Sequence, residues 1–143
     1  MKTLDDEIIR ICKNVYKPNK HCKGFGSKNE LALWWIDQLK IQNDCCDYCK
    51  TPIKLICELI DSKLLSGRKV KGDGVRGRQL ELERIDSFAD YSKSNCVLIC
   101  YYCNNDKSNV YSAADYKTYL APAKNKHFLF LQKKLAEIEK VNA

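Results

Sequence analysis

Two C-x-x-C pairs constrain the fold of this chain more than any other feature of its sequence. The first pair is Cys46 and Cys49, and the second is Cys100 and Cys103. Two such pairs in a small chain are typical of a tetrahedral zinc site, because four thiolates complete the coordination sphere of the ion. A complete sphere leaves no position for a substrate. We therefore expect a structural Zn²⁺ that contributes to folding.

The length and composition of the chain favour a single small domain. The chain has 143 residues, of which nine are cysteine, and a domain of this size has a modest core that a structural metal can reinforce. Its first residues, MKTLDDEIIRICK, are charged and lack the apolar run of a secretory signal. No apolar stretch approaches the length of a membrane span. These features predict a cytoplasmic protein with reduced thiols and no membrane partner.

The net charge of the chain indicates a polyanionic partner. It is formally +7, from 25 Lys and Arg residues against 18 Asp and Glu residues. Basic side chains that neutralise phosphates release counterions, and this release drives binding to nucleic acid. Together with the metal-site pattern, the charge favours a nucleic-acid partner.

Hydrophobic periodicity predicts helices towards both ends of the chain. Ser and Thr residues placed three positions before an acid are expected to open several of these helices as capping boxes. Residues 17–26, KPNKHCKGFG, are predicted to form a loop from their Pro, Asn and Gly content. Pro122 is predicted to break the chain between the last two helices. The helices are predicted over residues 3–16, 28–40, 53–65, 112–120 and 126–141.

The middle of the chain is predicted to hold two strands and a short helix. Residues 79–86 alternate apolar and polar side chains, and residues 95–99 form a more apolar run. A short helix is expected over residues 101–110. Residues 66–78, SGRKVKGDGVRGR, are rich in Gly and in basic side chains. This segment is predicted to be a mobile loop or a turn between strands.

The sequence from Leu82 to Asn109, LERIDSFADYSKSNCVLICYYCNNDKSN, resembles the HNH endonuclease family, also called the ββα-metal nucleases. The family pattern has an acid and a His at the end of one strand and an Asn at the start of the next. A C-x-x-C, an Asn and a Lys follow on a helix. The matching positions here hold Glu83, Arg84, Asn95, Cys100, Cys103, Asn104 and Lys107.

The resemblance implies an α+β fold with a small zinc-stapled ββα-metal core and flanking helices. The single domain, residues 1–143, would have N-terminal helices over 1–42, the core over about 43–111 and C-terminal helices over 112–143. Arg84 stands where the family has its general-base His. The segment ERIDSFADY is similar to a subgroup of restriction and phage enzymes with Arg in that place. At the positions that characterise this subgroup, the present chain has Arg84, Asp86 and Tyr91.

The resemblance also implies a catalytic Mg²⁺ or Mn²⁺ held by oxygen ligands from Glu83 and Asn104. Arg84 stays protonated, so we expect it to bind a phosphate oxygen rather than to accept a proton. His21 and His127 lie far from the motif in the sequence, which leaves Tyr91 as the best-placed general base. Asp86 either orients Arg84 or Tyr91 or caps the loop.

Basic residues near the motif are the expected contacts to DNA. Lys107 and Ser108 are expected to meet backbone phosphates from the helix. The basic segment, residues 66–78, either lies along DNA or is a solvated loop. If it lies along DNA, one of its Arg side chains could read base edges. The candidate DNA-binding residues of this segment are Arg68, Lys71, Arg76 and Arg78.

These observations predict a metal-dependent DNA endonuclease of restriction or defence type that hydrolyses phosphodiester bonds. A symmetric homodimer is expected, because two copies can cut the two strands of a duplex. Two alternatives remain open. The chain could be a non-catalytic zinc-stapled module that binds nucleic acid, or a nuclease that acts on RNA or without sequence preference.

Overall fold

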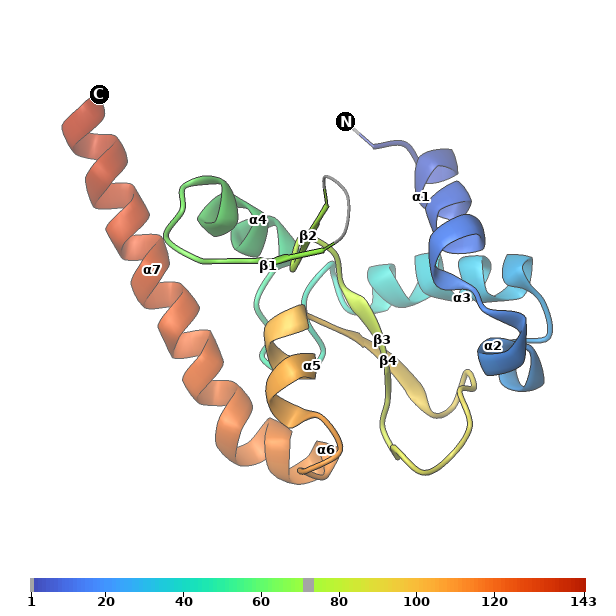
Figure 1. The fold of residues 1–143 in the computed structure, drawn as a ribbon. Coiled ribbons are helices and arrows are strands. Elements are labelled where there is room, and N and C mark those ends of the chain that lie inside the picture. The colour runs from blue at the N-terminus through green and yellow to red at the C-terminus, as the bar shows by residue number, and fades with distance from the viewer. Residues whose placement is uncertain (1, 71–73) are drawn as a thin grey trace. The chain divides into compact units, whose positions relative to one another are not determined.

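The computed structural model describes residues 2–70 and 74–143 of the chain. It is a mixed α+β structure of helices and short strands (Figure 1). The chain divides into two compact units. Unit 1 comprises Met1–Asn43 and Leu82–Leu98, and unit 2 comprises Asp44–Glu81 and Ile99–Ala143. The expected single domain over residues 1–143 stays a prediction.

Two helices of unit 1 begin at side-chain caps. α1 (Leu4–Arg10) opens on a capping box between Thr3 and Asp6, as predicted, and runs on into the π-helix η1 (Ile11–Val15). α3 (Lys28–Ile41) opens where the Ser27 hydroxyl accepts a hydrogen bond from the Glu30 amide. The buried side chains of Ile11, Leu31, Ala32 and Trp35 form the core of these helices.

The loop predicted over residues 17–26 is wrong, because α2 (Pro18–Phe25) occupies most of it. Pro18 stands in the first turn, where its fixed φ favours a helix and its missing N–H removes no bond. Gly26, with φ of 79°, ends the helix. His21 and Phe25, four residues apart, are both buried on one face of α2. Their burial outweighs the weak helix propensity of the Asn and Gly residues.

The two strands of the motif lie close to their predicted positions. β3 (Glu81–Arg84) and β4 (Cys96–Ile99) form a two-stranded sheet. The backbone amide of Ile85 donates to the carbonyl of Asn95 at 2.7 Å, which extends the pairing by one step into the connecting loop. Leu98 is fully buried in unit 1, as expected for a strand that is mostly apolar.

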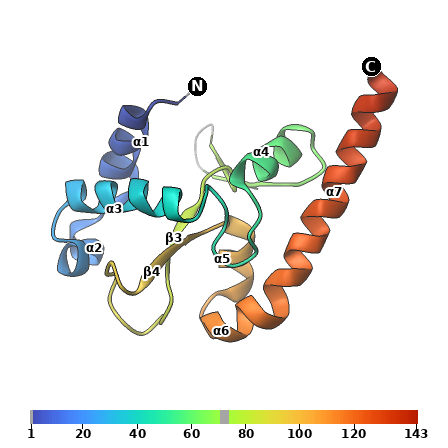
Figure 2. The same cartoon turned by 180° about the vertical axis from the view of Figure 1, so that it is seen from behind.

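Unit 2 contains the remaining helices and a small antiparallel ribbon. In the ribbon, β1 (Arg68–Lys69) pairs with β2 (Val75–Arg76), so the segment 66–78 contains two short paired strands, and the residues predicted to connect them lie partly outside the described residues. α4 packs against α7, with Ile56 and Leu59 of α4 and Phe128 of α7 in the core (Figure 2). The helices are α4 (Ile53–Asp61), α5 (Tyr101–Lys107), α6 (Ala113–Asp115), η2 (Tyr116–Leu120) and α7 (Ala121–Asn142).

Two predicted helix boundaries in unit 2 are wrong for identifiable reasons. α4 ends at Asp61 rather than at residue 65, because Lys63 adopts a left-handed φ of 64°. The amides of Lys63 and Leu64 then bond back to the last turn of α4, which is a Schellman ending. The predicted break at Pro122 does not occur. Pro122 lies in the first turn of α7, where proline is tolerated, and the chain passes directly from η2 into α7.

Among the helices of the described residues, none has the length and apolar character needed to cross a bilayer. The longest, α7, has 22 residues but carries charged side chains along its whole length.

Candidate functional site

Four buried cysteine sulfurs form a compact cluster in unit 2. All four lie within 4.8 Å of one another, and the sulfurs of Cys49 and Cys100 are 3.9 Å apart. A tetrahedral ion with Zn–S bonds of about 2.3 Å needs sulfurs about 3.8 Å apart. The donor set and spacing therefore fit a structural metal such as zinc, as predicted. This four-cysteine cluster consists of Cys46, Cys49, Cys100 and Cys103.

The first C-x-x-C pair lies on a tight turn that local hydrogen bonds shape. The Cys46 amide donates to the Thr51 carbonyl at 3.0 Å, and the Lys50 amide donates to the Cys46 carbonyl at 2.8 Å. Lys50 takes a left-handed φ of 61°, which lets the chain reverse directly after Cys49. The Cys49 amide also points at the Cys46 sulfur, 3.5 Å away. Such amides stabilise a thiolate on a metal.

The second C-x-x-C pair lies at the start of α5. Cys100 is the N-cap, and its sulfur accepts a hydrogen bond from the Cys103 amide at 3.4 Å. Helix N-termini stabilise negative charge, so the position suits thiolates. Hydrogen bonds from Cys100 hold the pKa of Cys46 and of Cys49 below the ordinary thiol value. Hydrogen bonds with Cys103 and the first pair raise the pKa of Cys100.

Asn104, the predicted ligand of the catalytic ion, lies on α5 directly after Cys103. Its amide nitrogen donates to Glu81 Oε1 at 2.8 Å. Glu81 also accepts two bonds from the Arg76 guanidinium, at 2.8 and 2.9 Å, and these bonds raise the pKa of Arg76. The guanidinium carbon of Arg76 lies 4.8 Å from the centre of the Tyr101 ring. Glu81 is an acid that the sequence reasoning missed, although it lies two residues before Glu83.

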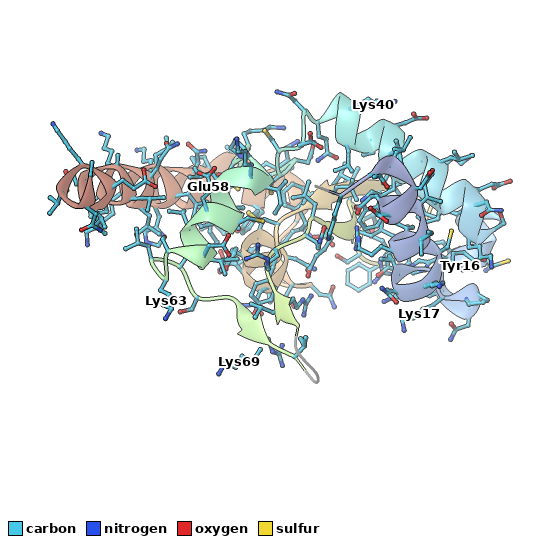
Figure 3. The ribbon with its side chains drawn as sticks, turned by 90° about the horizontal axis from the view of Figure 1, so that it is seen from above. Tyr16, Lys17, Lys40, Glu58, Lys63 and Lys69 are labelled. Atoms are coloured by element: carbon cyan, nitrogen blue, oxygen red, sulfur yellow. The ribbon has the colours of Figure 1, made fainter. Side chains whose placement is uncertain are left out.

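The structure puts the predicted DNA-binding arginines in different settings. Arg76 is committed to Glu81, and Arg78 forms an ion pair with Asp61 on α4. Arg68 is exposed on β1, and so is Lys69 beside it (Figure 3). Lys71 lies outside the described residues. The expected phosphate contacts therefore fall more readily to β1 than to β2.

Lys107, which is expected to meet backbone phosphates, is buried. The Lys107 side chain is only 1% exposed in the last turn of α5. Ser108 follows it with a left-handed φ of 46° and is exposed. Lys107 is three residues beyond Asn104, and α5 packs that side of the helix inwards. A surface contact to phosphate from this turn is therefore open to Ser108 but not to Lys107.

In unit 1, Arg84 and Tyr91 contact each other across the loop between β3 and β4. The guanidinium carbon of Arg84 lies 4.6 Å from the centre of the Tyr91 ring, and Arg84 Nη1 donates to the Ala89 carbonyl at 3.2 Å. Lys20 Nζ on α2 is 5.2 Å from the centre of the same ring. A ring flanked by two cations is a cation–π arrangement that fixes its orientation.

His21 also reaches this tyrosine, which its place in the sequence did not indicate. The ring centres of His21 and Tyr91 are 4.9 Å apart, with the rings edge to face. His21 Nδ1 accepts a hydrogen bond from the Lys17 amide at 2.9 Å. Burial, then the charges of Lys20 and Lys17, lower the pKa of His21, so the ring is neutral. Its proton is then on Nε2, which makes that atom a donor rather than a base.

The loop that carries Tyr91 is held by Asn95 and Asp86. Asn95 Nδ2 donates to the carbonyls of Asp86 and Asp90 at 3.1 and 3.0 Å, and Asn95 Oδ1 accepts from the Asp86 amide at 2.9 Å. The Asp86 carboxylate accepts from the Phe88 amide at 2.9 Å. Of the two roles considered for Asp86, the structure therefore has the loop cap.

The predicted pairing of Glu83 with Asn104 stays a prediction, because the two residues belong to different units. The Glu83 side chain is nearly buried on β3, with 9% of the residue exposed. Burial of a carboxylate on this strand is expected only where polar or charged partners are present.

The fold and the cluster together define an α+β protein with a four-cysteine centre that could hold a structural metal such as zinc. Comparisons of the chain with protein-family models, with curated proteins and with solved structures found no match.

Proposed function

We propose that this chain is a metal-dependent endonuclease of the HNH type that hydrolyses phosphodiester bonds in double-stranded DNA. A restriction or defence role suits a small chain that has to bind its target by itself. A symmetric homodimer would bring one site to each strand of the duplex. The four-cysteine cluster would hold the first turn of α5 and take no part in the reaction.

The position of Asn104 is the observation that carries the proposal. Asn104 follows Cys103 directly on α5, so a metal in the four-cysteine cluster would fix the helical turn that presents the amide. The elements before it run in the order strand, strand, helix, which is the order that the HNH resemblance implies. The contact between Arg84 and Tyr91 is independent support, because the resemblance names both residues.

Each residue of the proposed site has a role that suits its chemistry. Asn104 would offer its amide oxygen as a ligand, since its nitrogen donates to Glu81, and Glu83 would offer a carboxylate oxygen. A bound Mg²⁺ or Mn²⁺ would supply Lewis-acid polarisation of the phosphate. Arg84 would hold a phosphate oxygen, and Tyr91, in its phenolate form, would accept a proton from the attacking water and become a neutral phenol.

Cleavage of a defined plasmid tests the proposal, with Asn104→Ala as the decisive variant. We expect the parent protein to cut in Mg²⁺ or Mn²⁺, and Asn104→Ala to lose about 10²–10³-fold in rate, as when one charge-stabilising group is removed. Asn105→Ala is the matched control, because Asn105 is the exposed neighbour on α5. Both variants should keep the parent affinity for DNA, measured in Ca²⁺ by fluorescence anisotropy.

Other outcomes of the same experiment point to the alternative functions. Cleavage at the parent rate in excess chelator would contradict the metal-dependent mechanism. Salt-dependent DNA binding without cleavage in either metal would indicate a zinc-stapled binding module. Discrete bands would favour a sequence-specific enzyme, whereas a smear, or a preference for an RNA substrate, would favour a nonspecific or RNA-directed nuclease.

A further inference from the structure

The four-cysteine cluster is connected to the C-terminal helix through a buried threonine. Thr51 lies two residues after Cys49 and is completely buried. Its hydroxyl oxygen is 3.2 Å from the Cys49 sulfur, and it accepts a hydrogen bond from Asn125 Nδ2, also at 3.2 Å. Asn125 stands in the first turns of α7, 74 residues further along the chain. Neither residue belongs to either C-x-x-C pair.

A hydroxyl can both donate and accept a hydrogen bond, so the direction of the Thr51–Cys49 hydrogen bond can reverse when a metal binds. With a Cys49 thiol, the sulfur donates its proton to Thr51 Oγ1. Metal binding requires the thiolate, so the thiol proton leaves to solvent and the sulfur becomes an acceptor. The Thr51 O–H can then donate to the sulfur, while its oxygen still accepts from Asn125. Asn125 then donates a hydrogen bond to Thr51, and Thr51 donates one to the Cys49 sulfur, so each of these polar groups has a partner.

We propose that Thr51 and Asn125 are positioning residues of the metal centre, and that they couple metal loading to the docking of α7. Hydrogen bonds to a metal-bound thiolate orient it and lower its charge density, and loss of such outer contacts weakens metal binding. The coupling is reciprocal. An ordered α7 holds Asn125 against Thr51 and strengthens metal binding. Bound metal in turn stabilises the packing of α7 against the segment that carries Thr51.

The geometry favours this role over simple core packing. A buried hydroxyl with no partner is costly, and a Val of nearly the same shape would fill the position without that cost. Asn125 is half-buried and brings a second polar group to the same oxygen. Two polar side chains from distant parts of unit 2 therefore converge at the cluster. This inference requires only that the cluster binds metal, and it is independent of the nuclease proposal.

The test compares Thr51→Val, Thr51→Ser and Asn125→Ala in the full chain. Zn²⁺ affinity is measured by competition with a chromophoric chelator, and the sulfur-to-metal charge-transfer band is recorded with Co²⁺. We expect Thr51→Val to weaken Zn²⁺ binding about 10-fold or more and to shift the Co²⁺ band. Thr51→Ser, which keeps the hydroxyl, should restore both readouts, and Asn125→Ala should show a smaller loss. Thr118→Val is the control, because Thr118 is exposed on η2.

Hydrogen exchange tests the coupling to α7. Zn²⁺ should slow amide exchange over residues 121–131 in the parent protein, and the effect should be smaller in Asn125→Ala. Parent-like affinity together with an unshifted Co²⁺ band in Thr51→Val would overturn the positioning role. Exchange in α7 that does not respond to Zn²⁺ would overturn the coupling. Absence of Zn²⁺ binding by the parent would overturn both, whatever the plasmid assay shows.

Discussion

At the scale of single residues, Tyr91 is the side chain whose surroundings bear most directly on the proposed chemistry. It has Arg84 and Lys20 near its ring and the edge of His21 against it. His21 is neutral and donates from Nε2, so it is poorly suited to take a proton from water in this arrangement. Tyr91 therefore remains the candidate base, and His21 becomes a residue that holds it in place.

We expect Tyr91→Phe to lower the single-turnover cleavage rate by about 10²–10⁴-fold, the usual range for loss of a general base. The ring and its cation–π contacts remain, so DNA binding and stability should change little. Tyr119→Phe is the control, because Tyr119 is a largely exposed tyrosine. Cleavage by Tyr91→Phe at the parent rate would remove Tyr91 from the mechanism and direct attention to His21, tested as His21→Gln.

At the scale of elements, α2 lies against the loop between β3 and β4 through a contact that only glycine permits. A Cβ on Gly24 would overlap the carbonyl oxygen of Tyr91 and lie 2.8 Å from the Cα of Ser92. The exposed ion pair of Lys23 with Asp90, at 3.7 Å, spans the same contact but contributes little in water. The close approach of the two backbones is therefore what brings His21 to Tyr91.

Gly24→Ala distinguishes the effect of this tertiary contact from that of helix propensity, because the two predict opposite changes in the free energy of unfolding. Within a helix, Ala is favoured over Gly by about 1 kcal/mol. The clash with backbone atoms should outweigh this gain and lower the free energy of unfolding by about 1–3 kcal/mol. Urea unfolding measures the change, with Asn19→Ala at an exposed position of α2 as the control. A Gly24→Ala protein more stable than the parent would show that α2 does not dock on this loop.

At the scale of the whole molecule, the net charge of +7 does not reside in the motif alone. Arg76 and Arg78 are engaged with Glu81 and Asp61, and Lys107 is buried. Arg68 and Lys69 of β1 are exposed and are better placed to meet a phosphate. If the proposed partner is DNA, its phosphates would therefore meet exposed cations such as Arg68 and Lys69 rather than Arg76, Arg78 or Lys107.

Replacing Arg68 and Lys69 together by Ala should weaken DNA binding and reduce its dependence on salt, because fewer counterions are released. Each phosphate contact that is lost should lower the slope of log K against log salt by about 1. Lys126 and Lys133, both exposed on α7, are replaced by Ala in the control protein, which has the same net charge. Equal binding curves for the two double variants across salt would show that β1 makes no special contribution.

The local features of this chain could be predicted from its sequence. Each C-x-x-C brings two sulfurs to one turn, and two pairs predict the cluster because thiolates of this spacing share one ion. The cap of α1, the opening of α3 and the order of β3, β4 and α5 follow from neighbours a few residues apart. Such features depend on hydrogen bonds and periodicity within a short segment.

Only the tertiary structure decided the features that join distant segments. α2 is helical because packing buries His21 and Phe25, and His21 meets Tyr91 because Gly24 allows the backbones to approach. Asn104 donates a hydrogen bond to Glu81, and Asn125 donates one to Thr51, across separations of 23 and 74 residues. No local propensity encodes these pairs. They form because the core and the four-cysteine cluster fix the backbone, and buried polar groups must then find partners within reach.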